Sequence, residues 1–72
     1  MSRTREIEAA RRKFPVGARV RYWSGAKIGE PTGVGVVEAE PYMFGGHTLC
    51  AFIIKASGVH DHIAVTHLET NL

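Results

Sequence analysis

The stretch "HTLCAFIIK", residues 47–55, decides the fold because it is apolar on both faces of an extended strand. Successive side chains of a strand point to opposite sides. One face therefore holds Leu49, Ala51 and Ile53, and the other holds Cys50, Phe52 and Ile54. In so short a chain, a strand that is apolar on both sides needs a second apolar layer. We expect either an N-terminal helix or another subunit to supply it.

Three further segments alternate with the period of two that is typical of strands: "GARVRYW" (17–23), "VGVVEAE" (34–40) and "HDHIAV" (60–65). Between them stand segments rich in glycine and proline, which we expect to be loops: residues 24–33, 41–46 and 56–58. The last residues, 66–72, suggest a helical turn followed by an extended segment. Several short strands joined by such loops predict a small antiparallel barrel.

The N-terminal segment, residues 3–13, predicts a short helix. Ile7, Ala10 and Phe14 form one narrow apolar stripe at helical spacing, and Pro15 ends the helix. A helix of about ten residues is too short to be stable alone, so we expect it to dock on another element. The chain divides into a basic helix, residues 1–13, and a barrel, residues 14–72.

Charge is distributed unevenly along the 72 residues. Residues 1–21 carry seven Arg or Lys against two Glu, whereas the rest carries two Lys against five Asp or Glu, for a net charge of +2. A basic end can approach nucleic acid or an acidic protein face, although a solvated helix would have the same charge. The single cysteine, Cys50, suggests a cytoplasmic protein, and no apolar run is long enough to indicate a membrane partner.

The segment "FPVGARVRYWSGA", residues 14–26, keeps the spacing F-x-x-G-x-R-V-R-x-x-S-G-A. It resembles the opening of the plasmid-encoded type II dihydrofolate reductases, which are small SH3-like barrels. The end of the chain is also similar, with Val65, Leu68 and Glu69 in the family's V-x-x-L-E. Residues 45–48 and 63–69 resemble small proteins of bacteria and their phages. Together these resemblances imply a mainly β fold, a small SH3-like antiparallel barrel with a short N-terminal α-helix.

The reductase resemblance also implies a homo-oligomer with a central pore that binds NADPH and dihydrofolate. That family has a lysine after R-V-R, where this chain has Tyr22. Its Val-Gln-Ile-Tyr pore segment falls on Asp61, His62 and Ile63, or one residue later on His62, Ile63 and Ala64, without the glutamine and the tyrosine. Asp61 would repel two anionic ligands. We therefore expect the fold to carry over, and we assign no catalytic residue.

The histidines at positions 60 and 62 share one face of a strand, about 7 Å apart, a spacing that a metal site can use. His47 and Cys50 are three residues apart and face opposite ways on a regular strand, so they do not complete such a site. Asp61 points away from both neighbouring imidazoles and cannot orient them for acid–base catalysis. We expect no metal, and we interpret His60 and His62 as contact residues at a polar strand edge.

The most specific contact residues that the sequence suggests are Arg19, Arg21 and Trp23, which fall on one face of their strand. Tyr42 adds a second aromatic side chain, and Trp23 has barrel packing as its alternative role. The leading hypothesis is a non-enzymatic binding module of a bacterium, phage or plasmid that holds an acidic protein or nucleic acid and needs no cofactor. The alternatives are an NADPH-dependent reductase of the type II dihydrofolate reductase kind and a purely structural homo-oligomer.

Overall fold

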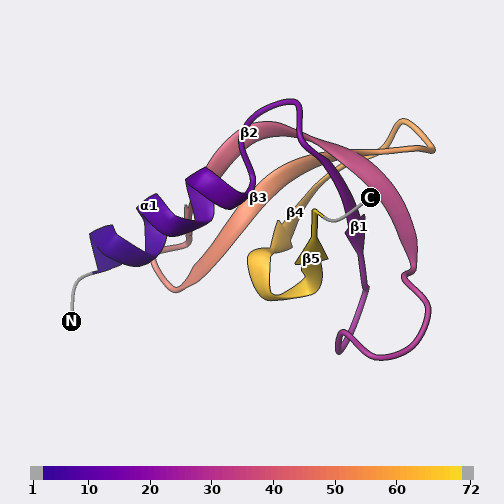
Figure 1. Ribbon diagram of the computed structural model, residues 1–72, viewed down its shortest axis with the longest axis horizontal. Helices are drawn as coiled ribbons and strands as arrows, with labels where there is room; N and C mark the ends of the chain where they lie inside the picture. Colours follow the sequence, from indigo (N-terminus) through magenta and orange to yellow (C-terminus); the bar gives the residue numbers. More distant parts are fainter. Residues whose placement is uncertain (1–2, 71–72) are drawn as a thin grey trace.

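The computed structural model describes residues 3–70 as one α-helix, five strands and a short 3-10 helix (Figure 1). In chain order these are α1 (Arg3–Lys13), β1 (Arg19–Tyr22), β2 (Gly33–Phe44), β3 (Thr48–Lys55), β4 (His60–Ala64), η1 (Val65–His67) and β5 (Leu68–Glu69). The predicted helix over residues 3–13 is present, and each predicted strand has its counterpart. The end of the predicted barrel, residues 71–72, lies outside the described residues.

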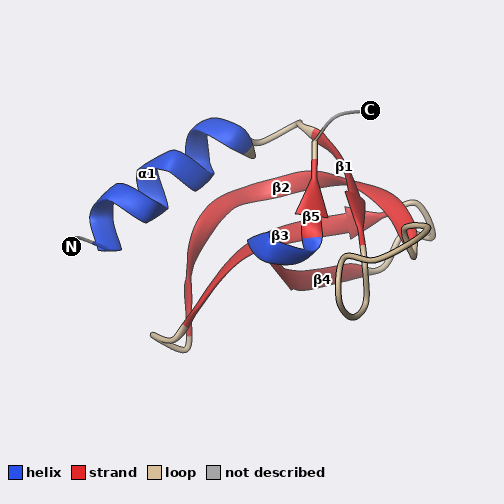
Figure 2. Ribbon diagram, turned by 60° about the horizontal axis from the view of Figure 1, so that its bottom comes forward, coloured by secondary structure: helices blue, strands red, loops and turns tan. Residues whose placement is uncertain are grey.

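All five strands belong to one antiparallel sheet with the order β4-β3-β2-β1-β5. The sheet curls so that β5 lies beside β1, as Figure 2 shows. Its two edges, β4 and β5, do not pair with each other within the described range 3–70, and we call the gap between them the seam. The expected mainly β, antiparallel fold with a short N-terminal α-helix is confirmed. The sheet is left open along the seam where a complete barrel was expected, and the SH3-like character stays a prediction.

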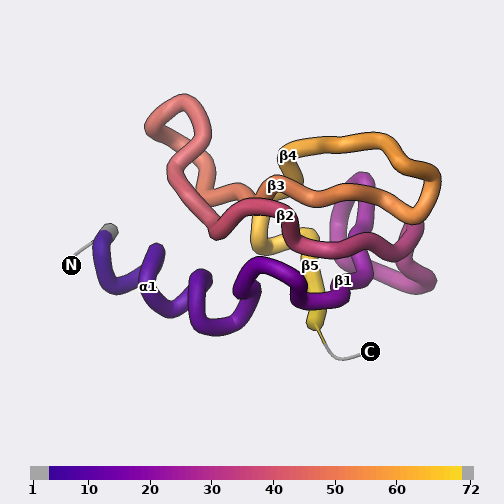
Figure 3. Tube along the Cα trace, turned by 90° about the horizontal axis from the view of Figure 1, so that it is seen from above, coloured from indigo at the N-terminus to yellow at the C-terminus, as the bar shows by residue number. Residues whose placement is uncertain are grey.

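The prediction of a loop at residues 41–46 is wrong, because β2 continues to Phe44. Pro41 cannot donate a backbone hydrogen bond to a neighbouring strand. The register with β3 shifts between Val37 and Ala39 and again between Ala39 and Tyr42. Such bulges accommodate a proline and bend the strand, and the bend is visible along β2 in Figure 3. The turn itself is confined to residues 45–47, where both glycines have positive φ angles.

The core fills the concave side of the curled sheet. Its buried members come from most of the elements: Phe14, Val20, Val37, Ala51, Ile53 and Leu68. Gly35 allows β2 to approach β3 closely here, because an added Cβ would stand 2.6 Å from the Ile54 carbonyl oxygen. A glycine inside this strand is thus a requirement of the packing.

The helix α1 docks on the barrel through the predicted stripe. Ala10 and Phe14 are buried, and Ile7 is half-buried. The Arg11 Nε donates a hydrogen bond of 3.0 Å to the Pro41 carbonyl oxygen, which ties the helix to β2. Phe52 and Ile54, on the convex side of β3, remain half-buried. The helix therefore closes one end of the core, and within the described residues it does not supply the expected apolar layer over Phe52 and Ile54.

Candidate functional site

The convex side of the sheet gathers nearly all of the predicted contact residues. Cα partners in an antiparallel sheet share a face, and one row runs from Arg19 to Val36, then to Ile54 and His60. On β1, β3 and β4, the residues two positions away extend this face. On β2, where bulges interrupt the alternation, contacts with His60 and His62 place Glu38, Tyr42 and Phe44 on it. We call it the outer face, and its members are Arg19, Arg21, Val34, Val36, Glu38, Tyr42, Phe44, Phe52, Ile54, His60 and His62.

An aromatic cluster occupies one end of the outer face, around His62. The His62 ring stacks on Phe44 with centroids 4.5 Å apart, and it lies 4.7 Å from Phe52 and 5.8 Å from Tyr42. Phe44 is 48 % exposed, so this cluster presents a ring surface to solvent. Sequence reasoning selected Tyr42 and His62 but missed Phe52, although the apolar pattern on both sides of residues 47–55 was a signal for it.

His60 lies beside this cluster and is held in place from two sides. Its ring stacks on Phe52 with centroids 5.7 Å apart. Its Nδ1 lies 2.6 Å from the Glu38 Oε1. Because a carboxylate only accepts, the hydrogen of this bond is on Nδ1. His60 and His62 are therefore held in place on the outer face, and the Glu38 carboxylate lies on the same face.

The other end of the outer face is an apolar groove of about 460 Å³, lined mainly by Arg19, Val34, Val36, Ile54 and Ala56. Arg19 is exposed at the rim of this groove. Arg21, two residues further along β1, makes an ion pair of 3.1 Å with Glu69 on β5. Arg19 is thus the cation of β1 that stands directly at the groove.

Trp23 takes the packing role rather than a place on the outer face. Its side chain is only 7 % exposed. The loop at residues 24–32 folds over it, and the indole Nε1 donates a hydrogen bond of 3.2 Å to the Gly29 carbonyl oxygen. The alternation of β1 would have placed Trp23 beside Arg19 and Arg21, but the strand ends at Tyr22. Trp23 is therefore mostly buried, and what remains accessible lines a cavity beside β4 and no part of the outer face.

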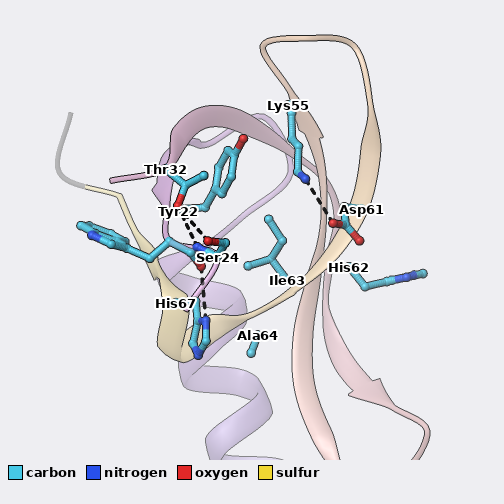
Figure 4. A pocket seen from close by; sticks show the side chains of 10 residues that line it. Tyr22, Ser24, Thr32, Lys55, Asp61, His62, Ile63, Ala64 and His67 are labelled. Carbon is cyan, nitrogen blue, oxygen red and sulfur yellow. Dashed lines mark hydrogen bonds and ion pairs between the residues drawn. The ribbon is translucent and has the colours of Figure 1, made fainter. Parts of the chain in front are cut away.

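A second concave region lies at the seam, where a cavity of about 310 Å³ opens between β4 and the loop at residues 24–32 (Figure 4). Lys55 and Asp61 form an ion pair of 3.2 Å at one side, and the Lys55 ammonium lies 5.2 Å from the centre of the Tyr22 ring. Ser24 and Thr32 hydroxyls line the opposite side, with His67 next to them. The cavity combines both charges with neutral hydrogen-bonding groups.

The described residues do not assemble a metal site or an activated nucleophile. Within residues 3–70, no group of three or more His, Cys, Asp or Glu side chains is placed to share a metal ion. Burial raises the pKa of the Cys50 thiol, and the nearby Asp61 carboxylate raises it further. A raised pKa lowers the thiolate fraction, which is the reactive form. His47 is exposed near the turn between β2 and β3.

Comparison with protein-family models, curated protein sequences and solved structures finds no match. In the described part of the chain, no helix has the length and apolar character that crossing a bilayer requires.

Proposed function

We propose that this chain is a small binding module that holds an acidic protein partner against its outer face. The observation that carries the proposal is the continuity of that face: the apolar groove with Arg19 at its rim runs directly into the aromatic cluster. Uncovered apolar and aromatic surface of this kind is typical of protein interfaces, in which aromatic and arginine side chains are enriched.

The charge of the surface favours an acidic partner. Arg19 stands at the groove, and α1 adds the exposed side chains of Arg5, Arg11, Arg12 and Lys13 elsewhere on the molecule. A partner with acidic side chains beside apolar ones would place a carboxylate at Arg19 while its apolar residues fill the groove. The field of the basic segment would speed its approach.

A protein fits the outer face better than nucleic acid does. Glu38 lies on this face and is bonded to His60, so a phosphate backbone, which is charged at every nucleotide, would meet a carboxylate as it crossed the aromatic cluster. An acidic protein can place its carboxylates at Arg19 and its apolar residues at the cluster. The groove between Val34, Val36 and Ile54 is apolar and suits an aliphatic or aromatic side chain of a protein. The experiment described next also tests for binding of nucleic acid.

To test this, random peptides displayed on phage are selected for binding to the immobilised chain. The enriched peptides are then synthesised, and their affinity for the chain is measured. We expect enriched peptides to combine acidic with aromatic or aliphatic residues. Arg19→Glu should weaken them by about tenfold or more, because it reverses the charge at the rim of the groove. The matched control is Arg12→Glu on the exposed side of α1, which changes the net charge equally and should change the affinity less than twofold.

Two results would overturn the proposal. Equal weakening by Arg19→Glu and Arg12→Glu would indicate attraction by net charge without a site. The absence of enriched peptides, together with tight and strongly salt-dependent binding of a fluorescent oligothymidine, would assign nucleic acid as the partner.

A second candidate is the oligomeric reductase, which one observation favours. The seam cavity brings together Asp61, His62 and Ile63, on which the reductase resemblance places the pore segment, with Tyr22, which stands where that family has its lysine. The Lys55 ammonium in that cavity is already paired with Asp61, so the cavity carries no net positive charge for two anionic ligands. Turnover of dihydrofolate with NADPH, in a species several times the 7.9 kDa of one chain, would support this candidate over the binding module. For the binding module, we propose that it acts in the bacterial cytoplasm and that a bacterium or a mobile element such as a phage or plasmid encodes it.

A further inference from the structure

The free edge of β4 has backbone groups that no described strand uses. Lys55 N–H donates to the Val59 carbonyl oxygen at 2.8 Å, so residues 55 and 59 form a hydrogen-bonded pair. The register from there to Ala64 is regular, and hydrogen-bonded pairs alternate with non-bonded ones in antiparallel sheets. Asp61 and Ile63 therefore bond to β3, whereas the N–H and C=O groups of His60 and His62 and the N–H of Ala64 point away from it. The Ala64 C=O begins the 3-10 helix η1.

The seam leaves room beside this edge. β5 comprises only Leu68–Glu69 and pairs with β1, so it does not reach β4. The seam cavity follows β4 through four consecutive residues, from Asp61 to Ala64 (Figure 4). An extended chain laid along β4 would find hydrogen-bonding partners in its backbone and a cavity for a side chain.

We propose that β4 accepts an extended segment of the partner protein as an additional strand, with one side chain of that segment in the seam cavity. The inference rests on the proposed function for the class of partner and adds the mode and place of contact. Backbone hydrogen bonds to β4 would supply affinity, and the side chains on alternate faces would supply specificity, as in other cases of strand addition.

A second copy of this chain fits the edge poorly. If the β4 strands of two copies paired antiparallel, the hydrogen bonds would have to form between residues whose backbone groups point outward, such as His60 and His62. Centring the pair on Asp61 would oppose Asp61 to its own copy, which is unfavourable for like charges. Centring it on His62 would place the charged Asp61 opposite the apolar Ile63. We therefore assign the edge to a segment of different sequence.

The surroundings of β4 define the chemistry of that segment. On the outer face, a residue opposite His62 would lie against the His62 ring, which itself stacks on Phe44, and should be aromatic or aliphatic. Its neighbours along the segment would point towards the seam cavity, where the Lys55 and Asp61 charges already balance. Hydroxyl groups of Ser24 and Thr32 line that cavity, so a neutral side chain with a hydroxyl or amide group suits it best.

The test uses the peptides enriched in the selection described above and one residue of β4. Ala64 has φ −59° and ψ 137°, which proline adopts without strain, and Ile63 before it is already extended. Ala64→Pro thus removes one outward N–H and leaves the bonds to β3 in place. Ala64→Val is the matched control, because it adds similar bulk and keeps the N–H. We expect Ala64→Pro to weaken the peptides about three- to tenfold relative to Ala64→Val.

Amide hydrogen exchange of the unmodified chain gives an independent readout. Saturating peptide should slow the exchange of the His60 and His62 amides about tenfold or more, while the already bonded Asp61 and Ile63 amides change little. Unchanged exchange and equal affinities of the two Ala64 variants, with the Arg19→Glu effect intact, would overturn strand addition and leave the proposed function standing. A free chain that is dimeric with protected His60 and His62 amides would also overturn it, because a second copy would occupy the edge.

Discussion

The two faces of β3 are nearly equal in apolar character and very different in environment. Ala51 and Ile53 on the concave side are fully buried in the core, whereas Phe52 and Ile54 on the convex side are half-buried, with no helix or second sheet of the described residues packed over them. The same eight-residue strand thus builds the fold with one face and exposes apolar surface with the other. The concave side therefore builds the core, and it is to the convex side that the proposed function assigns contact with a partner.

The largest expected effect is a loss of stability, and it should differ between the neighbouring residues Ile53 and Phe52. Ile53→Ala should lower the free energy of unfolding by about 2–5 kcal/mol, because it opens a cavity in a packed core. Phe52→Ala removes a half-buried ring and should cost less, about 1 kcal/mol, while weakening the selected peptides severalfold. Urea unfolding and peptide titration of both variants measure the contrast. A larger loss of stability for Phe52→Ala would contradict the division between the faces.

A smaller effect concerns Cys50, which belongs to the convex side of β3 by register yet is 5 % exposed. Burial and the Asp61 carboxylate raise the pKa of its thiol, so less thiolate is present at any given pH than in a free cysteine. Alkylation by iodoacetamide should accordingly be slower than for free cysteine at pH 8 and should accelerate only at more alkaline pH. Mass spectrometry follows the reaction. A rate equal to that of free cysteine at pH 8 would show that this part of the convex side is open.

Much of the fold follows from local patterns in the sequence. The stripe of Ile7, Ala10 and Phe14 predicted both the helix and its docking, and the period-two segments predicted the strands. The end of β2 was mispredicted because proline and two glycines within residues 41–46 are typical of a loop. Bulges in the pairing with β3 decide that segment, and they depend on contacts distant in sequence.

The sequence predicted most residues of the candidate site but not how they are arranged in space. Alternation within single strands selected Arg19, Arg21, His60 and His62, but their union on one face depends on the strand order, which the sequence does not contain. Trp23 was misplaced because alternation says nothing about the loop that folds over the end of a strand. Phe52 was missed because a strand that is apolar on both sides does not reveal which side will be covered.

The most direct test of the account compares Ile53 and Ile54, adjacent residues on opposite faces of β3. Methyl NMR spectra of the chain would be recorded during titration with a peptide from the phage selection. If the convex face binds the peptide, the Ile54 methyl signals will shift with the binding curve, together with those of Val34 and Val36, while the Ile53 signals move little. Shifts confined to α1, or no shift at Ile54 at saturation, would contradict the claim that the convex face of the sheet is the binding surface.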